Sequence, residues 1–276
     1  MPAPQESLFS QQAKTFFTAN GIQLPMDWQS PGEQFCDAFA ASERSVSPNS
    51  PTNLFAQATL NKYHVDAAAD IGKKFETFID ASISAICSAI DQWMKMTTIA
   101  GAVINGPSGM LMPGNVLGPP LAPLILAKAP QATAFELKYS VAIANAIGSA
   151  WQAWHAGLMG NLMYPSFAAF PGPMAPPTPN VPVPLLMFSS AGDAGLSAST
   201  LKSSMLANLG DPQALHAKEL FDAICKAFEL QLLTFKSTTM VQNVLGTGPI
   251  PTFAPPFVPV GPVLGGVGNG APGCLC

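Results

Sequence analysis

Residues 217–270 read AKELFDAICKAFELQLLTFKSTTMVQNVLGTGPIPTFAPPFVPVGPVLGGVGNG. The first part places apolar side chains at steps of three and four, which predicts one long amphipathic helix that ends at Gly246. The second part is apolar and rich in Pro and Gly, and so many ring-locked residues permit neither helix nor central strand. We therefore expect a helix that passes directly into an extended arm.

The same plan occurs twice earlier in the chain, in residues 75–124 and 135–186. One such unit buries a single apolar stripe and cannot stand alone, so like units should pack together. The segments align as Thr97-Thr98-Ile99 with Thr238-Thr239-Met240, an offset of 141, and as Leu162 and Phe170 with Leu245 and Phe253, an offset of 83. The sequence thus indicates three degenerate repeats.

The predicted fold class is mainly α, a pseudo-threefold bundle of three long helices with a small N-terminal helical cap and extended non-regular arms. We expect the long helices over residues 65–104, 133–164 and 211–245, and the three arms at the same end of the bundle. The expected boundaries are 1–60 for the cap, 61–130 for repeat unit 1, 131–188 for repeat unit 2, 189–210 for an insertion, and 211–276 for repeat unit 3 with its C-terminal arm.

Several helix starts carry capping signals. Thr133 and Glu136 form the pattern of a capping box, and a similar pattern begins at Ser30. Asp211-Pro212 combines a capping residue with a proline suited to the first helical position. A short helix is also expected over residues 7–20, and another over 201–209.

Charge is scarce in this chain. Only 10% of the residues are charged, against about 25% in ordinary soluble domains. Residues 139–192 and 237–276 contain no Asp, Glu, Lys or Arg at all. The net charge of −4 and the absence of Lys and Arg clusters exclude phosphate-backbone binding, so no nucleic acid is expected as a ligand. We expect partner subunits or lipid to cover much of the surface.

No motif indicates chemistry. His64, His155 and His216 stand one to a segment, and the five cysteines have no metal-ligand or disulfide spacing. The glycine run at 265–270 lacks the strand–helix unit of a dinucleotide site. Trp151 and Trp154 fall on an apolar stripe and are expected in the core. We predict no enzyme activity, no cofactor, no metal and no small-molecule substrate.

These features predict a non-enzymatic structural or assembly component of a symmetric multi-subunit particle, of the phage-tail-like or contractile-injection type. It would serve as a plug, a cap, a spike-associated part or packed cargo, with protein partners on a threefold or sixfold axis. The N-terminus lacks a basic region followed by an apolar run, so we expect synthesis in the cytoplasm without a signal peptide and incorporation into a particle that acts outside the cell.

The alternative is a membrane-active or pore-forming helical protein. Residues 141–163 have the length of a bilayer span. Polar residues within that segment and the unpaired carbonyls of the proline tracts favour the assembly instead.

The proline-rich arms are the predicted contact elements, because such segments lie along a neighbour at low ordering cost. We expect the arm after Gly246 to be separable from the folded helices. The candidate partner-binding residues are Phe170, Pro171, Met174, Phe253, Pro255, Phe257 and Pro259.

Overall fold

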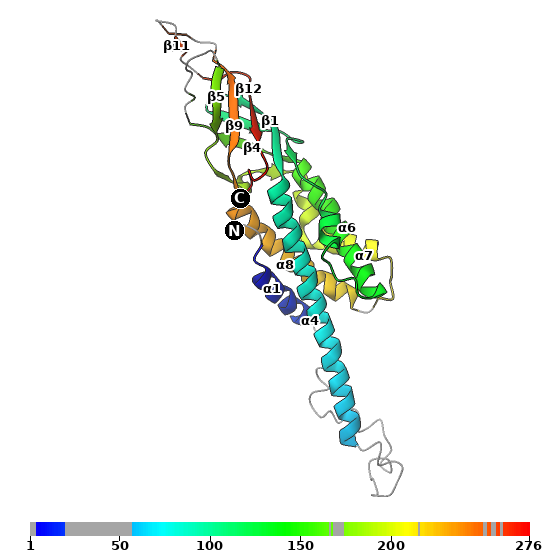
Figure 1. The fold of residues 1–276 in the computed structure, drawn as a ribbon. Helices are drawn as coiled ribbons and strands as arrows, with labels where there is room; N and C mark the ends of the chain where they lie inside the picture. Colours follow the sequence, from blue (N-terminus) through cyan, green and yellow to red (C-terminus); the bar gives the residue numbers. More distant parts are fainter. Residues whose placement is uncertain are drawn as a thin grey trace, which may run out of the picture.

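The computed structural model describes residues 4–19, 57–165, 167, 174–214, 216–250, 253–254, 258–259 and 262–276. The molecule is elongated, with helices towards one end and strands at the other (Figure 1). The expected helix start at Ser30 lies outside the described residues.

The predicted apolar stripes form the helical core. Ile83, Ile90 and Trp93 of one long helix are fully buried, as are Trp151 and Trp154 of the next. The Trp93 and Trp151 rings meet edge to face, with 5.1 Å between their centroids. The α-helices are α1 (Glu6–Ala19), α4 (Gln57–Met96), α5 (Leu121–Leu126), α6 (Ala134–Ala156), α7 (Ala198–Leu209) and α8 (Ala217–Thr238), joined by the 3₁₀ helices η3 (Leu185–Met187) and η4 (Asp193–Leu196).

The strands form a large antiparallel sheet. Eight of them belong to one sheet, in the order β5-β9-β12-β1-β2-β4-β7 with β3 beside β1. Two smaller sheets pair β10 with β11 and β6 with β8. The strands are β1 (Thr98–Asn105), β2 (Ser108–Leu111), β3 (Val116–Leu117), β4 (Leu158–Met163), β5 (Met174–Pro179), β6 (Val183–Pro184), β7 (Ser189–Ser190), β8 (Met240–Val241), β9 (Val244–Pro249), β10 (Phe253–Ala254), β11 (Val258–Pro259) and β12 (Gly266–Gly270).

The prediction of a mainly-α bundle of three long helices is therefore wrong. Each long helix ends earlier than expected, at Met96, Ala156 and Thr238, and passes into a strand. In β1 Ala102 and Ile104 are buried while Val103 faces outward, which is the two-residue period of a sheet, and a bulge separates them from the buried Ile99. The sequence interpretation failed because these segments are apolar or small at nearly every position, so helical and strand periods were not distinguished.

The proline tracts were also predicted wrongly as non-regular arms. Met174–Pro179 forms strand β5, which pairs with β9. Pro176 and Pro177 fall between Ala175 and Thr178, where the register of the β5–β9 pair shifts. Proline is tolerated at such an irregularity because no ladder hydrogen bond is required there. The glycine run at the C-terminal end is likewise regular, as strand β12.

The strands close into a ring. One end of the sheet path is β5, and the chain just after β5 returns to β4, where Val181 bridges Met163 and donates its N–H to the Met163 carbonyl at 2.7 Å. Tyr164, directly after β4, is buried inside this ring. The ring interior around Tyr164 is lined by glycines from three strands: Gly109, Gly246 and Gly268.

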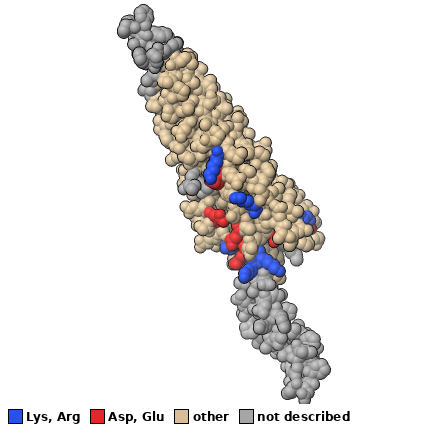
Figure 2. Space-filling view, viewed as in Figure 1, with Lys and Arg blue, Asp and Glu red and all other residues tan. Residues whose placement is uncertain are grey.

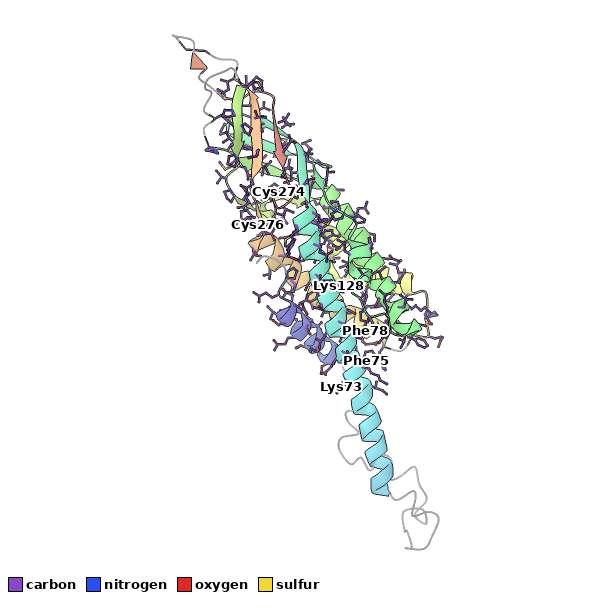
Figure 3. All side chains as sticks on the ribbon, in the orientation of Figure 1. Lys73, Phe75, Phe78, Lys128, Cys274 and Cys276 are labelled. Atoms are coloured by element: carbon purple, nitrogen blue, oxygen red, sulfur yellow. The ribbon has the colours of Figure 1, made fainter. Side chains whose placement is uncertain are left out.

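The C-terminal residues hold the sheet to the helices. Met240 and Cys276 exchange backbone hydrogen bonds of 2.7 and 3.0 Å, and the buried Cys274 thiol lies 3.6 Å from the Thr97 carbonyl oxygen. Figure 3 shows both cysteines at the junction between the sheet and the helices. Strand β12 lies between β9 and β1, so the expectation that the chain after Gly246 is separable from the fold is wrong.

Of two helix starts predicted from capping signals, one is confirmed and one is wrong. The capping box at Thr133 and Glu136 is confirmed, with both of its hydrogen bonds present. The start at Asp211 is wrong, because Asp211 caps a turn and α8 begins only at Ala217. The residue before it, His216, adopts a positive φ of 58°, which interrupts any earlier helix.

Candidate protein-interaction surface

Charge is distributed unevenly over the molecule. Residues 97–127, 139–192 and 237–276 contain no Asp, Glu, Lys or Arg, and every strand described lies within these segments. Figure 2 shows the consequence on one face: blue and red side chains gather over the helices, and the sheet end is without them. We call the surface formed by the strands and their connecting loops the sheet end.

The described helical end carries lysines and aspartates on its surface. Its lysines and aspartates form ion pairs between helices, such as Lys202 of α7 with Asp222 of α8 at 2.8 Å and Lys14 of α1 with Asp80 of α4 at 3.0 Å. Asp222 also pairs with Lys226, four residues along the same helix, at 2.6 Å. The strands contain no charge at all, and helix α5 and residues 139–156 of α6 also contain none.

The outer face of the sheet exposes apolar side chains. Alternation along the strands turns Val103 of β1, Met163 of β4, Leu245 of β9 and Val267 of β12 outward, with exposed fractions between 44% and 60%. An apolar surface without charge is typical of a protein-interaction site.

A groove on this outer face is lined by methionines. Met110 of β2 pairs with Asn161 of β4, so Met159 and Met163 are its diagonal neighbours on the same face. The groove holds about 450 Å³ and also includes the polar residues Asn161 and Ser189. Methionine side chains are flexible and polarizable, which suits them to contact a partner surface. The methionine groove is lined by Met110, Met112, Met159, Met163 and Met187.

The predicted partner-binding residues are only partly described. Met174 is the first residue of β5, lies opposite Pro249 and is about half exposed. Phe253 and Pro259 lie opposite each other in the β10–β11 pair, which follows β9 at the end of the sheet away from the helices (Figure 1). The other four lie outside the described residues: Phe170, Pro171, Pro255 and Phe257.

The methionine groove was missed by the sequence analysis. Its signal is the two-residue alternation in Leu158–Met163, which reads LMGNLM with Leu158 and Leu162 buried and Met159 and Met163 exposed. That segment was interpreted as the end of a helix, and a helical period gives no outward-facing row of methionines.

The buried titratable groups are structural. His155 is buried, its Nδ1 lies 3.0 Å from the Trp151 carbonyl oxygen, and burial lowers its pKa despite that bond. Burial likewise raises the pKa of the Cys274 thiol to about 11, which suppresses its thiolate. In the described part of the chain, no three His, Cys, Asp or Glu side chains are grouped so that they could hold a metal ion.

Comparison with known proteins identifies no relative: no protein-family model, no curated protein and no solved structure matches this chain. Among the described helices, none has both the length and the apolar character that crossing a bilayer requires.

Proposed function

We propose that this protein is a non-enzymatic structural subunit of a symmetric multi-subunit particle of the phage-tail-like or contractile-injection type, and that its sheet end contacts the neighbouring subunits. One observation supports this above the others: the sheet end exposes rows of apolar side chains and contains no charged residue. A surface that faces water in a small soluble domain is about 25–35% charged. The sheet end, with no charged residue, does not meet that condition.

The chemistry of the sheet end favours protein as the partner. Each exposed Met, Val or Leu side chain that becomes fully buried contributes about 1.5–3 kcal/mol. Several lie on the outside of the ring, including Met110, Met163 and Val267. Asn161 and Ser189 at the methionine groove offer hydrogen bonds that fix orientation. The described charged side chains, which lie on the helices and the turns beside them, remain in water in this arrangement.

Charge placed on the sheet end tests the proposal. Met110→Lys and Met163→Lys each put an ammonium group on a half-exposed outward position, where water solvates it in the isolated chain. In an apolar interface the same group is desolvated without a partner, which costs several kcal/mol. The matched controls are Phe135→Lys and Leu233→Lys, at exposed apolar positions on α6 and α8.

The measurement is the mass of the tagged, full-length protein isolated from the cells that encode it. We expect the wild type and both helical variants in a large species of fixed stoichiometry, and both sheet variants as free chains with unchanged circular dichroism and melting temperature. A wild-type protein recovered as a free monomer would contradict the proposal. Insertion of the lone chain into liposomes would support the membrane-active alternative.

A further inference from the structure

The closed ring contains three helix–strand units in cyclic order. α4 leads into β1 and then β2, α6 leads into β4 and then β5, and α8 leads into β9 and then β12. Around the ring the strands follow as β1, β2, β4, β5, β9 and β12, after which β12 pairs with β1. Each unit therefore contributes one strand that leaves its helix and one that returns.

The register between units can be measured from the helix ends. Val103, Met163 and Leu245 each lie seven residues after the last residue of their helices, which are Met96, Ala156 and Thr238. In the first step around the ring, Val103 pairs with Met110 and Met110 pairs with Asn161. Asn161 lies five residues after Ala156. From one unit to the next, the distance from the helix end therefore falls from seven residues to five, a loss of two residues in this step.

The second step has the same register. Met163 bridges Val181. The preceding residue, Asn180, lies opposite Val244, because its N–H donates to the Val244 carbonyl at 3.2 Å and its Oδ1 accepts the Val244 N–H at 2.9 Å. Val181 is therefore opposite Asn243, which lies five residues after Thr238. This step also loses two residues.

The third step repeats it again. Leu245 pairs with Asn269, and Asn269 lies opposite the bulge in β1, where its Oδ1 accepts the Gly101 N–H at 3.0 Å. Gly101 lies five residues after Met96. Gly101 and Asn243, at the same distance from their helices, both have positive φ, 77° and 56°. The first two steps thus share one register. In the third step the bulge sets both Ala100 and Gly101 opposite Asn269, and the hydrogen bond to the Gly101 N–H gives the same offset of two residues. The second and third steps also share a residue of positive φ at the same distance from the helix.

We infer that the ring is a pseudo-threefold surface whose partner is a threefold-symmetric protein trimer, with one partner subunit on each of three like faces. The inference rests on the proposed function and specifies its partner and copy number. Val103, Met163 and Leu245 mark the three faces, with exposed fractions of 45%, 60% and 44%. The contact surface of the trimer is apolar and uncharged, because the ring offers no charge to pair with one.

A second copy of this chain fits the ring less well. A twofold contact uses the same patch on both molecules, and it would leave two of the three like faces exposed. A threefold partner covers all three faces with the same set of contacts. Three contacts on one rigid ring also reinforce each other, because the first raises the effective concentration of the other two.

Photo-cross-linking of the full-length chain tests the symmetry. The photoreactive amino acid p-benzoylphenylalanine replaces Val103, Met163 or Leu245, one at a time, in the cells that encode the protein, and Leu233 of α8 is the exposed control position. We expect all three ring positions to cross-link to the same segment of the same polypeptide, and Leu233 to give no such product. Native mass spectrometry of the purified complex should give three partner chains for one copy of this chain.

Different results would overturn the threefold inference and the assembly proposal. Four cross-linking outcomes would overturn the threefold inference and leave the assembly proposal standing: links to three different polypeptides, links to unrelated segments, a link from one position alone, or a product with a second copy of this chain. A stoichiometry without a factor of three would do the same. The absence of a cross-link from all three positions would overturn both.

Discussion

At the scale of single residues, the ring is organised by one tyrosine among glycines. A Cβ atom at Gly109 or at Gly246 would lie 2.7 Å from the Tyr164 ring, which is closer than packed atoms approach. The Tyr164 hydroxyl has no hydrogen-bond partner among the described residues, and burial raises its pKa to about 12. A buried donor without a partner costs about 1–3 kcal/mol.

The packing of Tyr164 against Gly268 can be tested by substitution. Gly268→Ala places a Cβ 2.9 Å from the Tyr164 hydroxyl oxygen and should destabilise the protein by about 1–3 kcal/mol. Tyr164→Phe removes the unpartnered hydroxyl and should be neutral or stabilising by up to about 1 kcal/mol. In the double variant the clash is relieved, so the loss of unfolding free energy should be less than the sum of the changes in the two single variants. Urea unfolding measures all three variants.

Gly72→Ala is the matched control, because nothing lies within 4 Å of a Cβ at that helical position. It should stabilise α4 by about 0.5–1 kcal/mol, the difference in helix propensity. Strict additivity of Gly268→Ala and Tyr164→Phe would show that the tyrosine does not pack against the glycine.

At the scale of elements, the sequence predicts the helices better than their ends. The stripes that include Ile83, Trp151 and Phe235 are correctly assigned to the core, because a three-to-four residue period is unambiguous over several turns. The segments after Met96 and Ala156 were not assigned as strands, since each is short and apolar and its partners are distant in the chain. Pairing such as Ile104 with Gly266 depends on tertiary context.

The candidate site was less predictable than the fold. The sequence predicts the contact surface in the proline tracts, of which Met174, the first residue of β5, is about half exposed. The methionine groove required knowledge of strand register, because Met110 and Met159 are far apart in the sequence and meet only through the β2–β4 pair. The absence of charge, by contrast, was visible in the sequence itself.

The second prediction concerns the link between α7 and α8. Burial of the Asp222 carboxylate acts to raise its pKa, but the bonds from Lys202 and Lys226 outweigh it and hold the pKa below its usual value of 3.8. A lowered pKa gives stability that is present above the ordinary pKa and is lost as the pH falls through the lowered one. Asp222→Asn should therefore lower stability by about 1–3 kcal/mol at pH 7.

The difference between Asp222→Asn and the wild type should shrink as the pH falls below about 4, where the carboxylate of the unfolded wild-type chain begins to protonate while that of the folded chain is still ionised. Thermal melts at pH 7 and pH 3 measure it. Asp91→Asn is the control, since Asp91 pairs only along one helix with the exposed Lys95 and should change little at either pH. An Asp222→Asn effect of the same size at both pH values would contradict the role of the ion pair.

At the scale of the whole molecule, one chain combines two different surfaces. The charged residues that the structure describes lie on the helices and the turns beside them, and the sheet end holds none. Such a molecule is suited to stand with its helices in water and its sheet against other subunits. In this orientation the three like faces of the ring are the surfaces that meet the other subunits.

Methionine oxidation footprinting tests the orientation most directly. Native particles and the isolated chain are treated briefly with hydrogen peroxide, and oxidation at Met110, Met159 and Met163 is quantified by mass spectrometry, with acylation of the exposed Lys95 and Lys138 as the control. We expect the three methionines to react in the isolated chain and to be protected in the particle, while both lysines react in each. Equal oxidation of the three methionines in the two samples would contradict the proposed orientation.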